Sequence, residues 1–191
     1  MPRAGSASRM SPAWRCYITT RMAYDSGAMT DFDPERKIID RPTAALVSKS
    51  LRESGRTLVF TNGCFDILHP GHIGLLFKAR SLGDALMIGL NTDASVRRVK
   101  GMSRPVMDER SRAIMLAALE AVDWVVLFDE DTPKEIIQEV LPTVLVKGGD
   151  YKPEMVVGRE TVERAGGRVA IIPLVARHST SAILNKLEED E

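Results

Sequence analysis

Two histidines three positions apart carry the clearest chemical signal in the sequence. His69 and His72 enclose Pro70 and Gly71, and apolar residues then recur at helical spacing, so we expect a helix to begin at this segment. Proline suits the first position of a helix, where its missing N–H would lack a partner anyway, and Gly71 lets a phosphate come close to the backbone. A helix N-terminus favours phosphate through free N–H groups and a partial positive charge. Two imidazoles at that end therefore predict an anion site.

An anion site of this kind suits attack on the α-phosphate of a nucleoside triphosphate. Negative charge then builds on the phosphoryl oxygens and on the departing pyrophosphate, and donors aimed at those atoms stabilise the transition state. A His-x-x-His pair also occurs in metal sites. Zinc usually takes three or four protein ligands, however, and the one other histidine, His178, has no cysteine nearby. We predict no metal site built from protein ligands alone, with Mg²⁺ held mainly by the phosphates and water.

The segments around the histidines predict an α/β fold. Apolar runs without polar alternation are separated by helical segments, which indicates a parallel sheet covered on both faces. The expected fold class is a Rossmann-like three-layer α/β/α domain with a parallel five-stranded sheet, in which ligands bind beyond the carboxyl ends of the strands. The strands are expected at residues 57–61, 85–90, 124–128, 143–147 and 169–174. Helices are expected from Thr43 as N-cap to Gly55, and at 73–82, 111–121, 133–140, 160–165 and 179–187.

A polar, basic segment separates the second strand from the helix at 111–121. We interpret it as a mobile loop beside the anion site. Residues 92–110 include Arg97, Arg98, Lys100, Arg104 and Arg110.

Composition and charge exclude several classes of protein. The 191 residues suffice for one α/β domain, and 44% hydrophobic with 27% charged residues is typical of a soluble globular protein. Lys+Arg and Asp+Glu number 26 each, which argues against a nucleic-acid partner, because such binding normally needs a basic surface. The two cysteines, Cys16 and Cys64, form no disulfide framework, so we expect a reducing, cytoplasmic location. No apolar run approaches the ~20 residues that a membrane span needs.

The beginning of the chain differs from the rest, with four arginines and no acidic residue before Asp25. An organellar transit peptide has such a composition. A disordered extension, or a true translation start at Met22 or Met29, are the alternatives. Because the segment has no clear amphipathic period, we expect a disordered extension over residues 1–36 and a single domain over 37–191.

The segment at 61–72, with the sequence TNGCFDILHPGH, resembles the signature of the cytidylyltransferase-like nucleotidyltransferases, whose motif is His-x-Gly-His. Further segments are similar to those of the heptose 1-phosphate adenylyltransferases within that superfamily. They lie at 91–95, 100–101, 103–105, 118–124, 131–133 and 146–153, and the resemblance covers about residues 37–187.

By this resemblance, the loop at 62–66 surrounds the phosphates of the nucleotide, and His69 and His72 bind and stabilise them. Lys100 would reach the α-phosphate or the acceptor phosphate, although a solvated loop lysine is the simpler interpretation from the sequence alone. The predicted catalytic residues are His69, His72, Lys100 and Thr180. The predicted nucleotide-binding residues are Asn62, Gly63, Cys64, Phe65, Asp66, Gly71, Arg112, Lys147, Gly148, Gly149, Asp150, Ser179 and Ser181.

Several of these assignments leave an alternative open. Arg112 would contact phosphate or pair with Asp108 or Glu109 at the surface. Asp66 would orient a neighbour or assist Mg²⁺ rather than meet phosphate directly. The segment at 147–150 would bring its backbone close to the adenine or ribose, or form a common turn.

The segment at 179–181 matches a second family motif at the start of the last expected helix. Hydroxyl and free N–H groups there would make another anion site, and an ordinary N-cap is the alternative. His178, directly before it, would touch phosphate or be incidental.

The resemblance implies an enzyme that transfers AMP from ATP to a sugar 1-phosphate, heptose 1-phosphate first, and releases pyrophosphate. ATP, the sugar phosphate and Mg²⁺ are then its partners, in ADP-heptose synthesis for surface glycans. The alternatives are a cytidylyltransferase acting on glycerol 3-phosphate or another alcohol phosphate, and a non-catalytic nucleotide-binding module. Related proteins often carry a fused sugar kinase, so we expect a separate kinase here. We expect no nucleic-acid or membrane partner, and the sequence allows for a homodimer.

Overall fold

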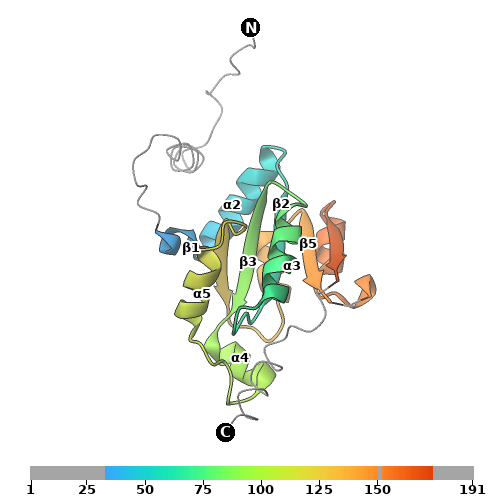
Figure 1. The fold of residues 1–191 in the computed structure, drawn as a ribbon. Coiled ribbons are helices and arrows are strands. Elements are labelled where there is room, and N and C mark those ends of the chain that lie inside the picture. The colour runs from blue at the N-terminus through green and yellow to red at the C-terminus, as the bar shows by residue number, and fades with distance from the viewer. Residues whose placement is uncertain (1–32, 150–151, 174–191) are drawn as a thin grey trace. The chain divides into compact units, whose positions relative to one another are not determined.

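Parallel strands form the centre of the domain (Figure 1). The computed structural model describes residues 33–149 and 152–173. Within these ranges, six strands follow the order β1-β4-β3-β2-β5-β6, and each neighbouring pair is parallel. Their bounds are β1 Ile38–Ile39, β2 Leu58–Gly63, β3 Ala85–Asn91, β4 Trp124–Phe128, β5 Val144–Gly148 and β6 Arg168–Ile172. The predicted parallel sheet is confirmed.

The predicted number of five strands is wrong by one. The additional strand, β1, pairs through Ile38 with Val125 and through Ile39 with Val126 at the edge of the sheet. Two residues are too few to show a periodicity, so the sequence gives no sign of this strand. Lys37, directly before it, donates from Nζ to the carbonyl oxygens of Leu119 and Val122 at 3.2 and 2.8 Å.

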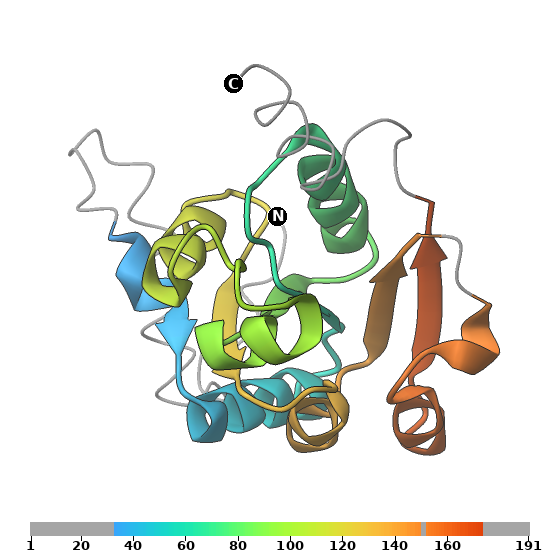
Figure 2. The same cartoon turned by 90° about the horizontal axis from the view of Figure 1, so that it is seen from below.

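Helices cover both faces of the sheet, as predicted (Figure 2). One face carries α2, Arg41–Glu53, with α6, Lys134–Val140, and α7, Arg159–Arg164. The other face carries α3, Pro70–Arg80, and α5, Glu109–Ala117. Two short 3₁₀ helices, η3 at Pro34–Lys37 and η4 at Pro153–Met155, also occur in the described ranges. The predicted last helix, at 179–187, lies outside the described residues.

Alternate residues of the strands point to opposite faces of the sheet, and this two-residue period decides which side chains enter the same part of the core. Leu86, Ile88 and Leu90 of β3 belong to the apolar cluster that also contains Leu76 of α3 and Leu116 of α5. Met87, between them, is equally buried but lies outside that cluster. Because both faces of β3 are covered, all seven of its residues are buried, which explains the continuous apolar run in the sequence.

The first helix begins earlier than predicted. Asp40, rather than Thr43, is the N-cap of α2, and its side chain accepts a hydrogen bond from the Thr43 amide at 2.9 Å. Aspartate is the stronger cap and stands three residues before the amide that it satisfies.

The predicted mobile loop at 92–110 is also wrong, because much of it is helical. Thr92 caps α4, Asp93–Lys100, by accepting a hydrogen bond from the Ser95 amide. Ser95 and Val96 are fully buried, so the short helix is packed against the domain although most of its residues are polar. In Figure 1 this helix lies at the end of the sheet toward which the strands run.

None of the helices in the described part of the chain combines the length and the apolar character that a bilayer span requires.

Candidate active site

The strand order places a topological switch point between β2 and β5. From β2 the chain first builds β3 and β4 on one side and then β5 and β6 on the other. Asn62 and Gly63 end β2, and Lys147 and Gly148 end β5. Ligands in open α/β sheets bind in the crevice beyond such strand ends. Four of the predicted nucleotide-binding residues therefore flank the expected crevice.

The predicted helix start at the histidine motif is confirmed. His69 is the N-cap of α3 with extended φ and ψ of −140° and 165°, and Pro70 is the first helical residue. The Nδ1 atom of His69 accepts a hydrogen bond from the His72 amide at 3.3 Å. The first histidine therefore caps the helix that carries the second one.

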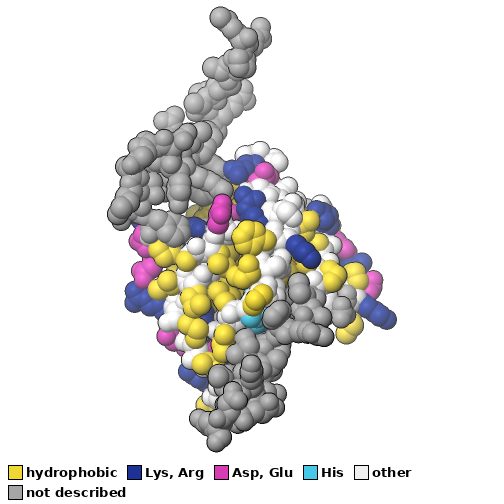
Figure 3. All heavy atoms as spheres, viewed as in Figure 1, with side chains coloured by type: hydrophobic (Ala, Val, Ile, Leu, Met, Phe, Trp, Pro, Cys, Tyr) yellow, Lys and Arg dark blue, Asp and Glu magenta, His cyan; other side chains and the backbone are white. Residues whose placement is uncertain are grey.

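The two imidazole rings are stacked. Their centroids are 3.7 Å apart and their planes differ by 21°. The ring of Phe65 packs against His72 at 5.1 Å with an interplanar angle of 55°. His69 is 8% exposed and His72 is half-buried, and a small area of histidine reaches the surface in Figure 3.

The loop that leads into the motif is strained at Phe65, whose φ is 43°. A non-glycine residue in this left-handed region of φ costs free energy, and the surrounding structure must hold it there. Such residues are often found at functional sites. Gly63 contributes to these surroundings, because a Cβ at this position would lie 3.2 Å from the Phe65 ring. The strained residue thus places an aromatic ring against the histidine pair.

Burial, together with the neighbouring His69 and Lys100, lowers the pKa of His72 from its ordinary value of 6.5 to about 4. Its imidazole is therefore neutral at pH 7 in the ligand-free site. Among the described residues, Nδ1 of His72 is a buried atom without a hydrogen-bond partner. A bound anion would favour the imidazolium form and raise this pKa.

Lys100 is the last residue of α4, and its ammonium lies close enough to His72 to affect that pKa. The structure therefore brings His69 and His72 into contact, and Lys100 acts on His72 electrostatically. The fourth, Thr180, lies outside the described residues, as do Asp150, Ser179, Ser181 and His178.

Lys147 and Cys64 lie on either side of the switch point and interact electrostatically. Burial lowers the pKa of Lys147, whereas Cys64 raises it. The Cys64 thiol also contacts Oδ1 of Asn91 at 3.9 Å. Gly149, with φ of 118°, donates its amide to Ile172 at 3.0 Å, which ties the end of β5 to β6.

Asp66 is buried and bonded to neighbouring protein groups, and its role in the site stays a prediction. Its side chain is 1% exposed, and its Oδ2 accepts a hydrogen bond from Nε of Arg104 at 2.6 Å. Its Oδ1 accepts the amides of Val106 and Met107 at 2.8 and 3.1 Å. Both oxygens are thus bonded to the segment that follows α4.

The predicted surface pairing of Arg112 with Asp108 or Glu109 is wrong. Its side chain is fully buried, and its guanidinium donates to the carbonyl oxygens of Met107 and Cys64 at 2.9 and 2.5 Å. It also forms an ion pair with Asp93 at 2.8 Å. The charge is therefore neutralised inside the protein by Asp93, not at the surface by Asp108 or Glu109. A direct contact between Arg112 and nucleotide stays a prediction.

Arg104 bonds to a predicted site residue, although the sequence predicts no specific role for Arg104 itself. Its side chain is 12% exposed and paired with Asp66. The basic segment and the Ser-Arg-Pro motif drew attention to this residue, but nothing in the sequence pairs it with a carboxylate 38 positions earlier.

Two carboxylates of the site are already paired with protein groups. The carboxylates of Asp66 and Asp93 are already bonded to arginines. In the described ranges, no three His, Cys, Asp or Glu side chains are grouped so that they could hold a metal ion. The prediction that phosphates and water hold most of the coordination shell of Mg²⁺ remains compatible with these contacts.

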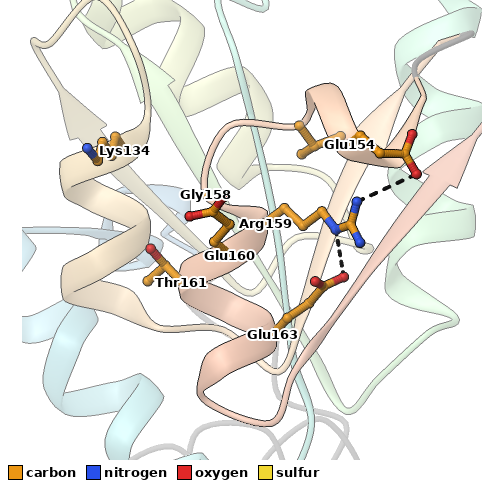
Figure 4. Close-up of a pocket in the computed structure, with 8 residues that line it drawn as sticks. Lys134, Glu154, Gly158, Arg159, Glu160, Thr161 and Glu163 are labelled. Atoms are coloured by element: carbon orange, nitrogen blue, oxygen red, sulfur yellow. Dashed lines mark hydrogen bonds and ion pairs between the residues drawn. The ribbon is translucent and has the colours of Figure 1, made fainter.

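A separate hollow lies between α6, η4 and α7 (Figure 4). Arg159 in its wall is paired with Glu163 at 2.9 Å and with Glu154 at 3.6 Å. Because carboxylates already neutralise this arginine, the hollow does not resemble an anion site.

The sequence of the chain is similar to the sequences of known proteins. A model of the cytidylyltransferase-like family matches residues 60–185. The bifunctional protein HldE of Geotalea uraniireducens is 54% identical over 155 residues, which are 81% of this chain and 32% of that protein. The HldE of Syntrophotalea carbinolica is 58% identical over 136 residues, or 71% of this chain and 28% of that protein. The chain thus spans about a third of the length of these curated relatives.

Solved structures show the same fold. The lipopolysaccharide core biosynthesis protein from Thermoplasma volcanium is 32% identical with a TM-score of 0.52, covering 63% of this chain and 98% of that one. The pantoate-beta-alanine ligase from Francisella tularensis, at 14% identity and a TM-score of 0.50, covers 80% of this chain and 77% of that one and shares the fold alone. The family match begins within β2 and includes the histidine motif and α3. The chain therefore belongs to the cytidylyltransferase-like family of nucleotidyltransferases.

Proposed function

We propose that the protein transfers AMP from ATP to a sugar 1-phosphate, with heptose 1-phosphate as the first candidate, and releases pyrophosphate. The observation that carries the proposal is the stacked pair of His69 and His72 at the start of α3, with the Lys100 ammonium close by. A neutral imidazole, a lysine and a helix N-terminus together suit a triphosphate better than a neutral ligand.

In the proposed reaction, an oxygen of the acceptor phosphate attacks the α-phosphorus of ATP in line. The new P–O bond forms as the bond to the pyrophosphate oxygen breaks, and pyrophosphate leaves with the electron pair. His72 and Lys100 stabilise the charge that builds on the phosphoryl oxygens. Mg²⁺ carried by the triphosphate would neutralise charge on the leaving group.

The sugar is the less constrained part of the proposal. Similarity of several segments to heptose 1-phosphate adenylyltransferases supports a heptose, and the similar protein from Thermoplasma volcanium is described as acting in lipopolysaccharide core biosynthesis. We propose that a separate kinase phosphorylates the sugar before this reaction. We propose a cytoplasmic setting for both steps, in line with the two cysteines and no predicted disulfide framework.

A panel of pyrophosphate-release assays tests the proposal. ATP and CTP are each paired with heptose 1-phosphate and with glycerol 3-phosphate. Release with ATP and heptose 1-phosphate alone is expected. Release only with CTP and glycerol 3-phosphate would replace the proposal with the cytidylyltransferase alternative. Binding of ATP without release from any acceptor would favour a non-catalytic nucleotide-binding module.

A further inference from the structure

The loop after β2 is joined to the segment after α4 by buried charged groups. Asp66 belongs to the loop that leads to His69, and it accepts hydrogen bonds from Arg104, Val106 and Met107. Its side chain is 1% exposed. A buried carboxylate with a charge-assisted bond and two amide donors is a strong attachment point.

Arg112 holds the same segment from the other side. It donates to the carbonyl oxygen of Met107, whose amide donates to Asp66. It also donates to the carbonyl oxygen of Cys64 in the loop after β2. Met107 is therefore fixed through both of its backbone polar groups by residues tied to that loop.

These attachments fix the position of the C-terminal end of α4 relative to the loop after β2. Arg112 pairs with Asp93 in the first turn of α4. The backbone amide of Asp93 also donates a hydrogen bond to Glu109 at 2.7 Å. After the helix, the Gly101 amide bonds to Arg97 and the Arg104 amide bonds to Gly101, at 2.9 and 3.1 Å. Only a short turn therefore separates Lys100 from the residues that Asp66 holds.

We propose that Asp66 is a positioning residue of the active site, which holds Lys100 beside His72 through the segment at 101–107. This inference rests on the proposed nucleotidyl transfer for its catalytic consequence. Asp66 itself does not contact the nucleotide. Its two oxygens are occupied by protein donors, and a carboxylate facing a triphosphate would repel it.

A double-mutant cycle in the full chain separates positioning from direct contact. Asp66→Asn, Lys100→Ala and the double variant are compared for kcat and KM of pyrophosphate release and for the Kd of Mg-ATP. Asp66→Asn is expected to lower kcat at least about 10-fold, the scale for losing one positioned donor. In the Lys100→Ala background the same change is expected to have little further effect. Independent, multiplying losses in the two backgrounds would overturn the inference, as would an unchanged kcat.

Asp123→Asn is the matched control. Asp123 is likewise buried, accepts a backbone amide from Leu86 at 2.9 Å and pairs with Arg80 at 3.1 Å. It directly precedes β4, at the opposite end of the sheet from the site. This variant is expected to lose stability but to keep the kcat of the folded enzyme. If Asp66→Asn does not fold, Asp66→Glu enters the same cycle, because it keeps the charge but displaces the backbone at 104–107.

A ligand-free readout keeps the inference separate from the proposed function. The ring of His72 is titrated by NMR in the same four proteins, without nucleotide. The direct electrostatic effect of removing Asp66 is present with or without Lys100, so the difference between the two backgrounds isolates the part that passes through Lys100. A shift of the His72 pKa that depends on Lys100 is expected. The same shift in both backgrounds would overturn the positioning role, even if no acceptor gives turnover.

Discussion

The imidazole rings of His69 and His72 are stacked 3.7 Å apart at the first turn of α3. Two imidazolium ions at this distance would repel each other, and burial together with the charges of His69 and Lys100 lowers the pKa of His72 to about 4. The ligand-free site therefore holds a neutral ring at pH 7. A bound triphosphate would supply the negative charge that favours protonation of the same ring.

Removing the second ring tests its role in turnover. His72→Ala is expected to lower kcat about 100- to 1,000-fold, the usual effect of losing one donor to a developing negative charge. Lys78→Ala, an exposed lysine on the same helix, is the control and should leave kcat unchanged. Steady-state pyrophosphate release measures both, with circular dichroism to check the fold. Wild-type turnover by a folded His72→Ala protein would exclude the assigned role.

The lowered pKa of His72 makes stability depend on pH. Between the ordinary histidine pKa of 6.5 and about 4, the unfolded chain takes up a proton at this residue and the folded chain does not. The free energy of unfolding should therefore decrease as the pH falls through this window. Urea denaturation at pH 7 and pH 5 measures the change. In His72→Gln the decrease should be smaller, and an equal decrease in both proteins would show that another group is responsible.

Lys100 can be compared with a neighbour on its own helix. Lys100→Ala is expected to lower kcat/KM at least about 10-fold, because it removes a cation from the charge that stabilises the transition state. Arg97→Ala removes an exposed cation one turn earlier and should have little effect. Equal losses in the two variants would indicate that α4 contributes only general positive charge. In that case, raising the salt concentration should not restore the kcat/KM of one variant more than that of the other.

Packing behind the site predicts one effect on stability. Gly89 of β3 leaves no room for a side chain, because an added Cβ would lie 2.7 Å from Cζ of the fully buried Phe60. Gly89→Ala is expected to destabilise the fold by about 1–3 kcal/mol, the range for overpacked cores. Thermal unfolding measures this loss. Gly89→Ala combined with Phe60→Leu should recover part of it, and a wild-type Tm in the single variant would contradict the packing argument.

The sequence predicted those features that local patterns encode. The apolar runs of β2 to β6 and the Pro70 helix start follow from period and capping, and the structure confirms them. β1 was missed because two residues show no period. The sequence predicts a loop where α4 lies, because the exposed face of this helix is basic. Thr92 before Asp93 is the capping signal that identifies the helix.

The contacts within the site depend on pairs that lie far apart in the chain. Arg104 is 38 positions from Asp66, and Arg112 is 48 positions from Cys64. No local pattern connects these residues, because their meeting is a consequence of strand order. The residue types in the motif could therefore be assigned to a phosphate site, whereas the charge pairing that holds the site together could not.

The most direct test of the account is the titration of the His72 ring by NMR with and without Mg-ATP. In the free protein we expect a pKa of about 4. With bound Mg-ATP we expect a higher value, because the triphosphate stabilises the imidazolium. A His72 pKa that is the same with and without saturating Mg-ATP would show that the stacked histidines do not hold the phosphates.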